Sequence, residues 1–210
     1  MNTNNSNTAQ QGGHVSIDRG IFSLGSNFNQ RYISDYKKLA KLIEHCKGLG
    51  LRVVLTQGTY DMLHIGHARY FEEAKKHGDV LVVGVDSDEK VRARKGPERP
   101  VVPENERLEM VAHLRPVDVV VLKALKAPRW QLIKMVKPDV LIATKQTYTK
   151  AEIVELHKIC GKVIALEPMA TTSTSAKIRK LQINTAKSFG ATLTPKIIRA
   201  IEEVLEKIKD

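Results

Sequence analysis

The sequence has little cysteine and no long apolar run. Its two cysteines, Cys46 and Cys160, form no C-x-x-C pair, which favours a reducing compartment over a disulfide framework. No apolar run approaches the length of a membrane span, and the polar first residues lack the apolar core of a signal peptide. We therefore expect a cytoplasmic protein with no membrane span.

Aromatic residues are also scarce, at 5% of the chain, and this bears on how its basic charge is interpreted. The formal net charge is +11, and basic chains often bind nucleic acid. However, the sequence has no recognition-helix, zinc-finger or aromatic-platform motif, so stacking on bases is poorly supported. Much of the excess lies in residues 90–99, and phosphorylated small molecules are polyanions too. We expect such ligands and no nucleic acid, with a solvated surface as the alternative for Arg92 and Arg94.

Apolar runs alternate with amphipathic segments from residue 51 onward. The apolar runs predict strands at 51–57, 79–85, 117–122, 139–143 and 162–166. The segments between and after them predict helices at 68–76, 104–114, 129–136, 150–159 and 175–181. This alternation predicts an α/β fold, a Rossmann-like doubly wound parallel sheet with helices on both faces and ligands at the carboxyl ends of the strands.

The two flanks of this region are less regular. Residues 1–30 begin with a stretch poor in apolar residues and are expected to be a disordered tail. The domain, residues 31–190, is expected to begin with a lead-in helix at 32–47. Residues 191–210 are expected to form a C-terminal helix, because apolar residues recur at helical spacing from residue 197 to residue 208. That stripe is interpreted as core packing or as the cover of a dimer interface or of the active site.

The segment GTYDMLHIGH, residues 58–67, is the most specific feature of the sequence. It follows the apolar run 51–57 and precedes a helix-forming stretch, so we expect a strand, a tight loop and the start of a helix. His64, Gly66 and His67 would then lie at a helix N-terminus, where unpaired backbone N–H groups and the helix dipole bind phosphate. The two imidazoles can donate to the same anion. A metal site or a helix cap is the alternative role for these histidines.

A second feature, the triplet Ser-Thr-Ser at residues 173–175, opens the last helix of the alternating region. By itself it predicts a loop or a helix cap. Together with the motif at 58–67, in this order and at this separation, it makes the chain resemble the cytidylyltransferase-like nucleotidyltransferases over roughly residues 51–183. Their signatures are a G-T-F-D-x-x-H-x-G-H string after the first strand and a later Ser-Thr-Thr or Ser-Thr-Ser triplet.

The resemblance implies an enzyme that moves a nucleoside monophosphate from a nucleoside triphosphate to a phosphorylated small molecule. It also implies a homodimer, and Mg²⁺ held mainly by the substrate phosphates, without a metal site in the protein. The residues implied to be catalytic are His64, His67 and Lys95. Those implied to bind the nucleotide are Thr59, Tyr60, Asp61, Gly66, Arg107, Ser173, Thr174 and Ser175. Those implied to bind the acceptor are Arg92, Arg94 and Arg99.

Two of these assignments have structural alternatives. Asp61 alone is typical of a turn residue. Arg107 lies in a stretch, residues 103–122, that is similar both to heptose 1-phosphate adenylyltransferases and to archaeal-type FAD synthases. Its alternative role is an ion pair with Glu104 or with Asp118.

Within the family, residues 83–101 point to the acceptor. They match the pattern V-G-V-N-S-D-x-x-V-x-x-x-K-G-x-x-R-P-V of the heptose 1-phosphate adenylyltransferases, which implies ATP and a sugar phosphate. Residues 143–148 lack the glycines of the K-G-G-D-Y-like segment of those enzymes. Residues 168–172 lack the arginine that precedes the triplet in glycerol-3-phosphate cytidylyltransferases, which favours ATP over CTP.

Other activities are open at this stage. They are a CTP-dependent cytidylyltransferase for glycerol 3-phosphate or phosphoethanolamine, and an adenylyltransferase like the FAD synthases. A nucleotide sensor or a nucleic-acid-binding protein is the non-enzymatic alternative.

Overall fold

A computed structural model describes residues 26–145, 147–167, 169 and 174–207 of the chain. Within them, five strands form one all-parallel sheet in the order β3-β2-β1-β4-β5. Their bounds are β1 Val53–Gly58, β2 Val80–Asp86, β3 Val119–Lys123, β4 Val140–Thr144 and β5 Lys162–Leu166. The chain starts at the centre, winds to one edge and then crosses to the other, which confirms the predicted Rossmann-like doubly wound sheet.

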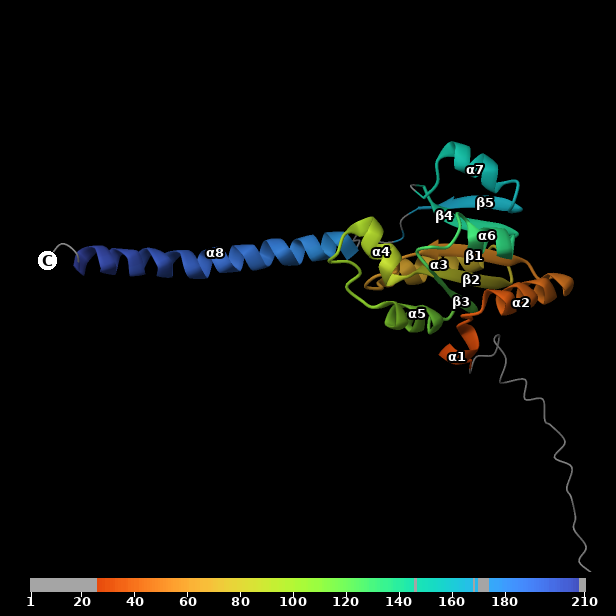
Figure 1. Ribbon diagram of the computed structural model, residues 1–210, viewed down its shortest axis with the longest axis horizontal. Coiled ribbons are helices and arrows are strands. Elements are labelled where there is room, and N and C mark those ends of the chain that lie inside the picture. Colours follow the sequence, from red (N-terminus) through yellow and green to blue (C-terminus); the bar gives the residue numbers. More distant parts are fainter. Residues whose placement is uncertain (1–25, 146, 168, 170–173, 208–210) are drawn as a thin grey trace, which may run out of the picture.

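Eight helices surround or extend this sheet in the described residues (Figure 1). Their bounds are α1 Phe28–Arg31, α2 Tyr36–Gly48, α3 Ile65–Lys75, α4 Asp88–Lys95, α5 Glu104–Ala112, α6 Gln131–Val136, α7 Lys150–Leu156 and α8 Thr174–Lys207. Buried side chains of α2, α6 and α7 form a core on one face of the sheet, and those of α3 and α5 form a core on the other. In contrast, α8 projects away from this body as a long rod (Figure 1).

The central strands show why both faces are covered. In β1, Val53 and Leu55 belong to the core beneath α2 and α6, whereas Val54 between them belongs to the core beneath α3. All seven residues of β2 are buried. Because successive side chains of a strand point to opposite faces, a run that is apolar at every position can be stable only between two layers of helices.

Three aspartates hold the amino ends of the strands. Asp79, just before β2, accepts a hydrogen bond from the backbone N–H of Arg52 (2.8 Å). Asp118, before β3, accepts from Leu81 (2.6 Å), and Asp139, before β4, accepts from Val53 (2.7 Å). Each carboxylate therefore ties its own strand to the chain beside it, at the edge opposite to the carboxyl ends.

Three elements differ from the sequence-based expectations. Residues 88–95, interpreted as a charge run, form α4, because Ser87 caps the helix and its acidic and basic residues lie in the first and last turns, respectively, where the helix dipole favours them. The disordered tail was expected to reach residue 30, but residues 28–31 form α1 with a capping box at Asn27; the rest of that tail, residues 1–25, lies outside the described residues.

The third difference is α8. The separate helices expected at 175–181 and in 191–210 are parts of this one 34-residue helix, which continues through Gly190 and Pro195. In the described part of the chain, no helix is both long and apolar enough to cross a membrane.

Candidate active site

Both histidines lie at the N-terminus of α3, as the sequence predicted. His64 ends the loop between β1 and α3, and His67 lies in the first turn of the helix. His64 is the N-cap of α3, and its Nδ1 accepts a hydrogen bond from the backbone N–H of Gly66 (3.1 Å). His67 lies one turn further on, and its Nδ1 accepts from the backbone N–H of His64 (3.3 Å). The two ring centroids are 4.0 Å apart. The pair therefore forms a capping box made of imidazoles.

These hydrogen bonds fix which nitrogen of each ring holds the proton. An Nδ1 that accepts a backbone N–H carries no proton of its own, so a neutral ring carries its proton on Nε2. The Nε2–H is the donor type that a phosphate oxygen requires. Two such rings at the positive end of α3 thus combine side-chain donors with the helix dipole.

The loop before His64 has an unusual backbone. Tyr60 and Met62 both have positive φ angles, 54° and 52°, in the left-handed region that L-residues seldom adopt. The ring of Tyr60 is buried and lies so close to Gly58 that a Cβ there would be 2.8 Å from its Cζ. Tyr60 also contacts the His67 ring edge-on, with centroids 5.7 Å apart. Tyr60 therefore packs beneath the β1–α3 loop, and burial raises its pKa well above the usual range.

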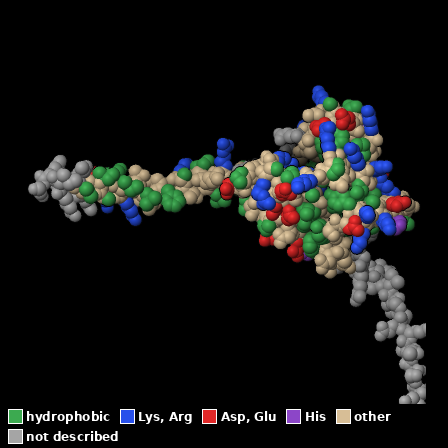
Figure 2. Space-filling view, viewed as in Figure 1, with side chains coloured by type: hydrophobic (Ala, Val, Ile, Leu, Met, Phe, Trp, Pro, Cys, Tyr) green, Lys and Arg blue, Asp and Glu red, His purple; other side chains and the backbone are tan. Residues whose placement is uncertain are grey.

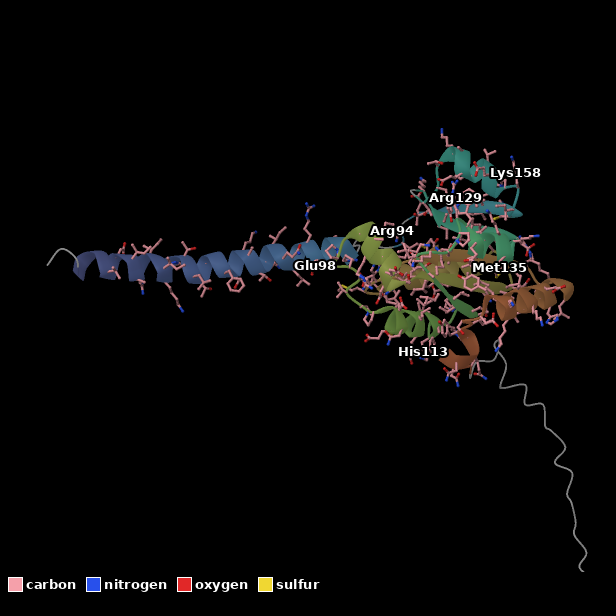
Figure 3. The ribbon with its side chains drawn as sticks, viewed as in Figure 1. Arg94, Glu98, His113, Arg129, Met135 and Lys158 are labelled. Atoms are coloured by element: carbon pink, nitrogen blue, oxygen red, sulfur yellow. The ribbon has the colours of Figure 1, made fainter. Side chains whose placement is uncertain are left out.

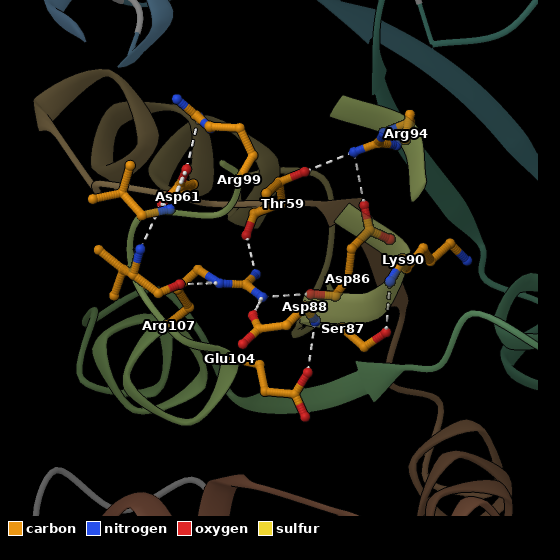
Figure 4. Close-up of polar contacts among 12 residues, drawn as sticks. Thr59, Asp61, Asp86, Ser87, Asp88, Lys90, Arg94, Arg99, Glu104 and Arg107 are labelled. Atoms are coloured by element: carbon orange, nitrogen blue, oxygen red, sulfur yellow. Dashed lines mark hydrogen bonds and ion pairs between the residues drawn. The ribbon is translucent and has the colours of Figure 1, made fainter. Parts of the chain in front are cut away.

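Asp61 anchors a neighbouring loop. Its carboxylate, 2% exposed, accepts hydrogen bonds from the backbone N–H groups of Val101 (3.1 Å) and Val102 (3.0 Å). It also forms an ion pair with Arg99 at 2.7 Å. These contacts join the β1–α3 loop to the loop before α5 (Figure 4). The structure thus gives Asp61 a positioning role within the site in which the sequence placed it.

Arg107 is buried beneath the same loops, with an exposed fraction of 1%. Its guanidinium donates to the carbonyls of Val102 (2.9 Å), Asp86 (2.8 Å) and Thr59, and to the carboxylate of Asp88 (2.7 Å) (Figure 4). Arg107 therefore joins three segments, which are the β1–α3 loop, the end of β2 with the start of α4, and the loop before α5. It is buried and does not belong to the exposed cations of the site. The alternative role that the sequence offered for Arg107 was an ion pair with Glu104 or Asp118; the structure has an ion pair with Asp88.

A buried carboxylate, Asp86, organises the cations at the end of β2. It forms ion pairs with Arg94 of α4 at 3.0 Å and with Lys123 of β3 at 3.1 Å. Arg94 also donates to the hydroxyl of Thr59 (2.6 Å). Burial lowers the pKa of Lys123, and the facing carboxylate of Asp86 offsets part of that effect. This cluster joins the carboxyl ends of β2 and β3 to the β1–α3 loop.

A pocket of about 340 Å³ opens beside this cluster at the carboxyl ends of the strands. Its walls include Lys90, Arg94, Lys123 and Arg129, and Trp130 with other aromatic residues. Arg129 lies over the Trp130 ring, 4.1 Å from the ring to the guanidinium carbon. Figure 3 labels Arg94 and Arg129, which reach the pocket from α4 and from the segment before α6. A cationic pocket with aromatic walls fits an anionic organic molecule better than a bare ion.

A second hollow lies where α8 leaves the body. It is a groove of about 870 Å³ lined by Lys95 and Arg99 on one side and by residues of α8 on the other, which are Ala176, Ile178, Arg179, Lys180, Gln182 and Ile183. The Nε of Arg99 is buried there without a hydrogen-bond partner in the part of the chain that the structure describes. Partial burial lowers the pKa of Lys95, and repulsion from Arg94 and Arg99 adds to this effect.

The structure thus divides the predicted acceptor-binding arginines. Arg94 lines the pocket and Arg99 lines the groove, whereas Arg92 is an exposed residue of α4 that lines neither of these two hollows. Ser173 lies outside the described residues, and of Thr174 and Ser175 only the helical backbone at the start of α8 is described.

Sequence reasoning missed Asp86 and Lys123. The available signal was their position: each is the last residue of a strand in a sheet whose ligands lie at the carboxyl ends. Among the described residues, no group of three or more histidine, cysteine or acidic side chains is arranged to hold a metal.

Comparison with known families agrees with this geometry. The family model for cytidylyltransferase-like proteins matches residues 55–187, which is more than half of the chain. The chain therefore belongs to the cytidylyltransferase-like family, and residues 55–187 are a nucleotidyltransferase domain. The resemblance inferred from the two motifs is confirmed.

Among individual proteins, the chain is similar to HldE proteins of several bacteria. The bifunctional protein HldE of a Nitratiruptor species is 35% identical over 153 residues, which are 73% of this chain and 32% of that protein. HldE of Geobacter metallireducens is 43% identical over 110 residues, 52% of this chain and 22% of that protein. The chain thus spans about a third or less of the length of these relatives.

One similar solved structure is matched over its entire chain. The lipopolysaccharide core biosynthesis protein from Thermoplasma volcanium GSS1 is 33% identical, with a TM-score of 0.50. The match covers 58% of this chain and 100% of that one.

Proposed function

We propose that the chain transfers adenosine monophosphate from ATP to a phosphorylated sugar and releases pyrophosphate, as a cytoplasmic enzyme. The observation that carries this proposal is the pair of histidines at the N-terminus of α3, each with its Nδ1 occupied by a backbone N–H. Arg94 of α4 and Arg99 of the loop after it contact the same β1–α3 loop, which suits a reaction that brings two phosphorylated molecules together.

The proposed reaction needs no general base. A phosphate oxygen of the acceptor attacks the α-phosphorus of the nucleotide, the bond from that phosphorus to the bridging oxygen of the β-phosphate breaks, and pyrophosphate leaves with the bonding electrons. The acceptor phosphate is already an anion, so the protein must position two repelling anions and stabilise the charge that develops. His64 and His67 donate to the triphosphate in this scheme, and Lys95 bridges the incoming and the leaving phosphates.

The start of α8 completes the nucleotide site in this proposal. Ser173, Thr174 and Ser175 are proposed to bind the β- and γ-phosphates together with the helix N-terminus. The donors around the site are histidine, lysine and arginine, which suit phosphates, and the carboxylates Asp61 and Asp86 are already ion-paired. Mg²⁺ would therefore be held mainly by the substrate phosphates, whose charge it screens.

The acceptor is proposed to occupy the 340 Å³ pocket next to Asp86. Lys90, Arg94 and Arg129 can attract its phosphate, and the buried Asp86 and the amide of Gln57 can bind hydroxyl groups of a sugar. The similarity to HldE proteins and the match at residues 83–101 support a sugar phosphate with ATP.

A substrate matrix tests this proposal. Pyrophosphate release is measured with the four nucleoside triphosphates, each crossed with heptose 1-phosphate, other sugar 1-phosphates, glycerol 3-phosphate, phosphoethanolamine and FMN. We expect ATP with a sugar phosphate to give the highest kcat/KM. Activity with CTP and a small alcohol phosphate, and none with ATP and any sugar phosphate, would overturn the choice of substrates but not the in-line mechanism.

Lys95→Met is expected to lower turnover much more than it weakens binding of the nucleotide alone. The reason is that a charge between two phosphates matters most when both are present, as in the transition state. Calorimetry of ATP binding and single-turnover kinetics separate the two effects. Lost ATP affinity with unchanged turnover of the bound complex would make Lys95 a binding residue only.

The pH dependence gives a second test of Lys95. Because its pKa is lowered, Lys95 loses its charge at a lower pH than an ordinary lysine, and the rate is expected to fall as the pH rises through that value. Lys95→Arg keeps its charge at alkaline pH, so the fall should move to higher pH in this variant. The same alkaline fall in both proteins would exclude Lys95 as its source.

A further inference from the structure

The long helix α8 has an apolar stripe with no partner among the residues that the structure describes. Every described side chain from Leu181 to Val204 is exposed, and Leu193, Ile197 and Val204 are 45%, 55% and 56% exposed, respectively. Figure 2 shows hydrophobic side chains along the rod, away from the body. A helix of 34 residues is about 51 Å long, and such helices owe most of their stability to packing of an apolar face. We therefore expect the apolar stripe to pack against a second protein surface.

The spacing of the stripe indicates that this surface is another helix. Its residues alternate by three and four positions, as in a coiled coil: Ile183, Ala186, Gly190, Leu193, Ile197, Ala200 and Val204. No contact with the described part of its own chain requires a glycine at position 190, because a Cβ there would meet nothing within 4 Å. Glycine in a helix interior is destabilising relative to alanine, but it lets a second backbone approach closely.

We propose that α8 pairs antiparallel with α8 of a second copy of this chain. From Ile183 to Ala200 the stripe has three large and three small residues, placed so that each large side chain can face a small one only if the two helices run in opposite directions. In that arrangement Ile183 faces Ala200 of the other copy, Ala186 faces Ile197, and Gly190 faces Leu193. A parallel pair would instead place alanine on alanine and glycine on glycine, which leaves voids between layers of large residues.

Charge supports the same direction. The groove beside the first turns of α8 is lined by Lys95, Arg99, Arg179 and Lys180. In the antiparallel pair, the last turns of the other helix lie next to this groove, and their sequence at 202–206 contains three glutamates. A parallel pair would place basic turns beside basic turns and acidic beside acidic. The proposal does not rest on the reaction catalysed, and its test measures assembly.

The test uses sedimentation of the full chain with single and double variants. Ala186→Ile places isoleucine against Ile197 of the partner, and Ile197→Ala places alanine against Ala186. Each is expected to raise the dimer dissociation constant by about tenfold or more. The double variant A186I/I197A exchanges large for small in the same layer and should restore the wild-type constant. Ile198→Ala is the matched control, because Ile198 is 50% exposed but lies outside the stripe, and it should have no effect.

Several outcomes would overturn the proposal. A tighter dimer with A186I and no restoration in the double variant would indicate parallel helices. Equal effects of I197A and I198A would show that the stripe is not an interface. A wild-type chain that stays monomeric would also overturn it, including the case in which α8 binds vesicles of phosphatidylcholine and phosphatidylglycerol instead.

Cross-linking tests the direction independently. A mixture of chains carrying Ile183→Cys and Ala200→Cys is expected to form a disulfide-linked heterodimer on oxidation. Chains with Ile183→Cys alone should not cross-link, because their thiols lie in different layers of an antiparallel pair. The native thiols Cys46 and Cys160 are buried in the body and do not compete. The opposite pattern would contradict the antiparallel arrangement.

Discussion

His67→Asn is expected to lower turnover by about 10²- to 10³-fold, the usual cost of removing one preorganised donor to a transition state. The imidazole of His67 accepts the backbone N–H of His64 through Nδ1 and carries its proton on Nε2. An asparagine oxygen can replace the Nδ1 acceptor, because it lies at a similar distance from the backbone. It cannot place a donor where Nε2 lies, so the cap is kept and the donor is lost.

His64→Asn provides a parallel test with a clear separation of fold and chemistry. Asparagine is among the preferred N-cap residues, so the free energy of unfolding should stay close to that of the wild type. His64→Ala removes both cap and donor and should lose about 1 kcal/mol of stability in addition to activity. Steady-state kinetics and urea unfolding measure the two effects. Near-normal turnover by folded His64→Asn and His67→Asn proteins would remove both residues from the catalytic site.

Arg107→Met is expected to cause the largest loss of stability, about 3–5 kcal/mol, because it leaves buried polar groups without partners. The guanidinium satisfies the carbonyls of Thr59, Asp86 and Val102 and the carboxylate of Asp88. Methionine fills a similar volume but donates nothing, so three loops lose their common support. Denaturant unfolding measures the loss.

Arg115→Met is the matched control for this experiment. Arg115 lies just after α5 and is exposed, so the same replacement there should change stability by no more than about 0.5 kcal/mol. Arg107→Lys should fall between the two, because lysine keeps the charge but lacks the planar fork that reaches several acceptors. A stable Arg107→Met protein that fails only to bind ATP would instead place Arg107 in direct contact with the nucleotide.

Most of the sheet was predictable because its signal is local. Continuous apolar runs such as 80–86 mark strands covered on both faces, and all five were found close to their actual bounds. Elements with few buried residues were harder. In α4 only Val91 is buried, so charge dominates its sequence. For α8, two separate helices were expected at 175–181 and in 191–210, yet one helix continues through Gly190 and Pro195.

The site was predictable where one segment contains it. The predicted strand, loop and helix placed His64 and His67 at the start of α3, where the structure has them. The roles of Asp61 and Arg107 could not be predicted in this way, because most of their partners are distant in sequence. The partners of Asp61 lie 38 residues or more away. Those of Arg107 lie 19 residues or more away, apart from the nearby Val102. Their partners are set by how the loops meet, which no local pattern encodes.

The aspartates at the amino ends of the strands have a consequence for how this fold can change. Asp79, Asp118 and Asp139 fix the alignment of the strands at the rim opposite to their carboxyl ends. A slip of one residue would move every side chain of a strand to the opposite face and disrupt both cores, and these anchors oppose it without help from the loops of the other rim. Loop sequences there, including the segment that follows β4, can therefore be exchanged while the strands stay in place. Specificity is open to redesign at one rim because alignment is secured at the other.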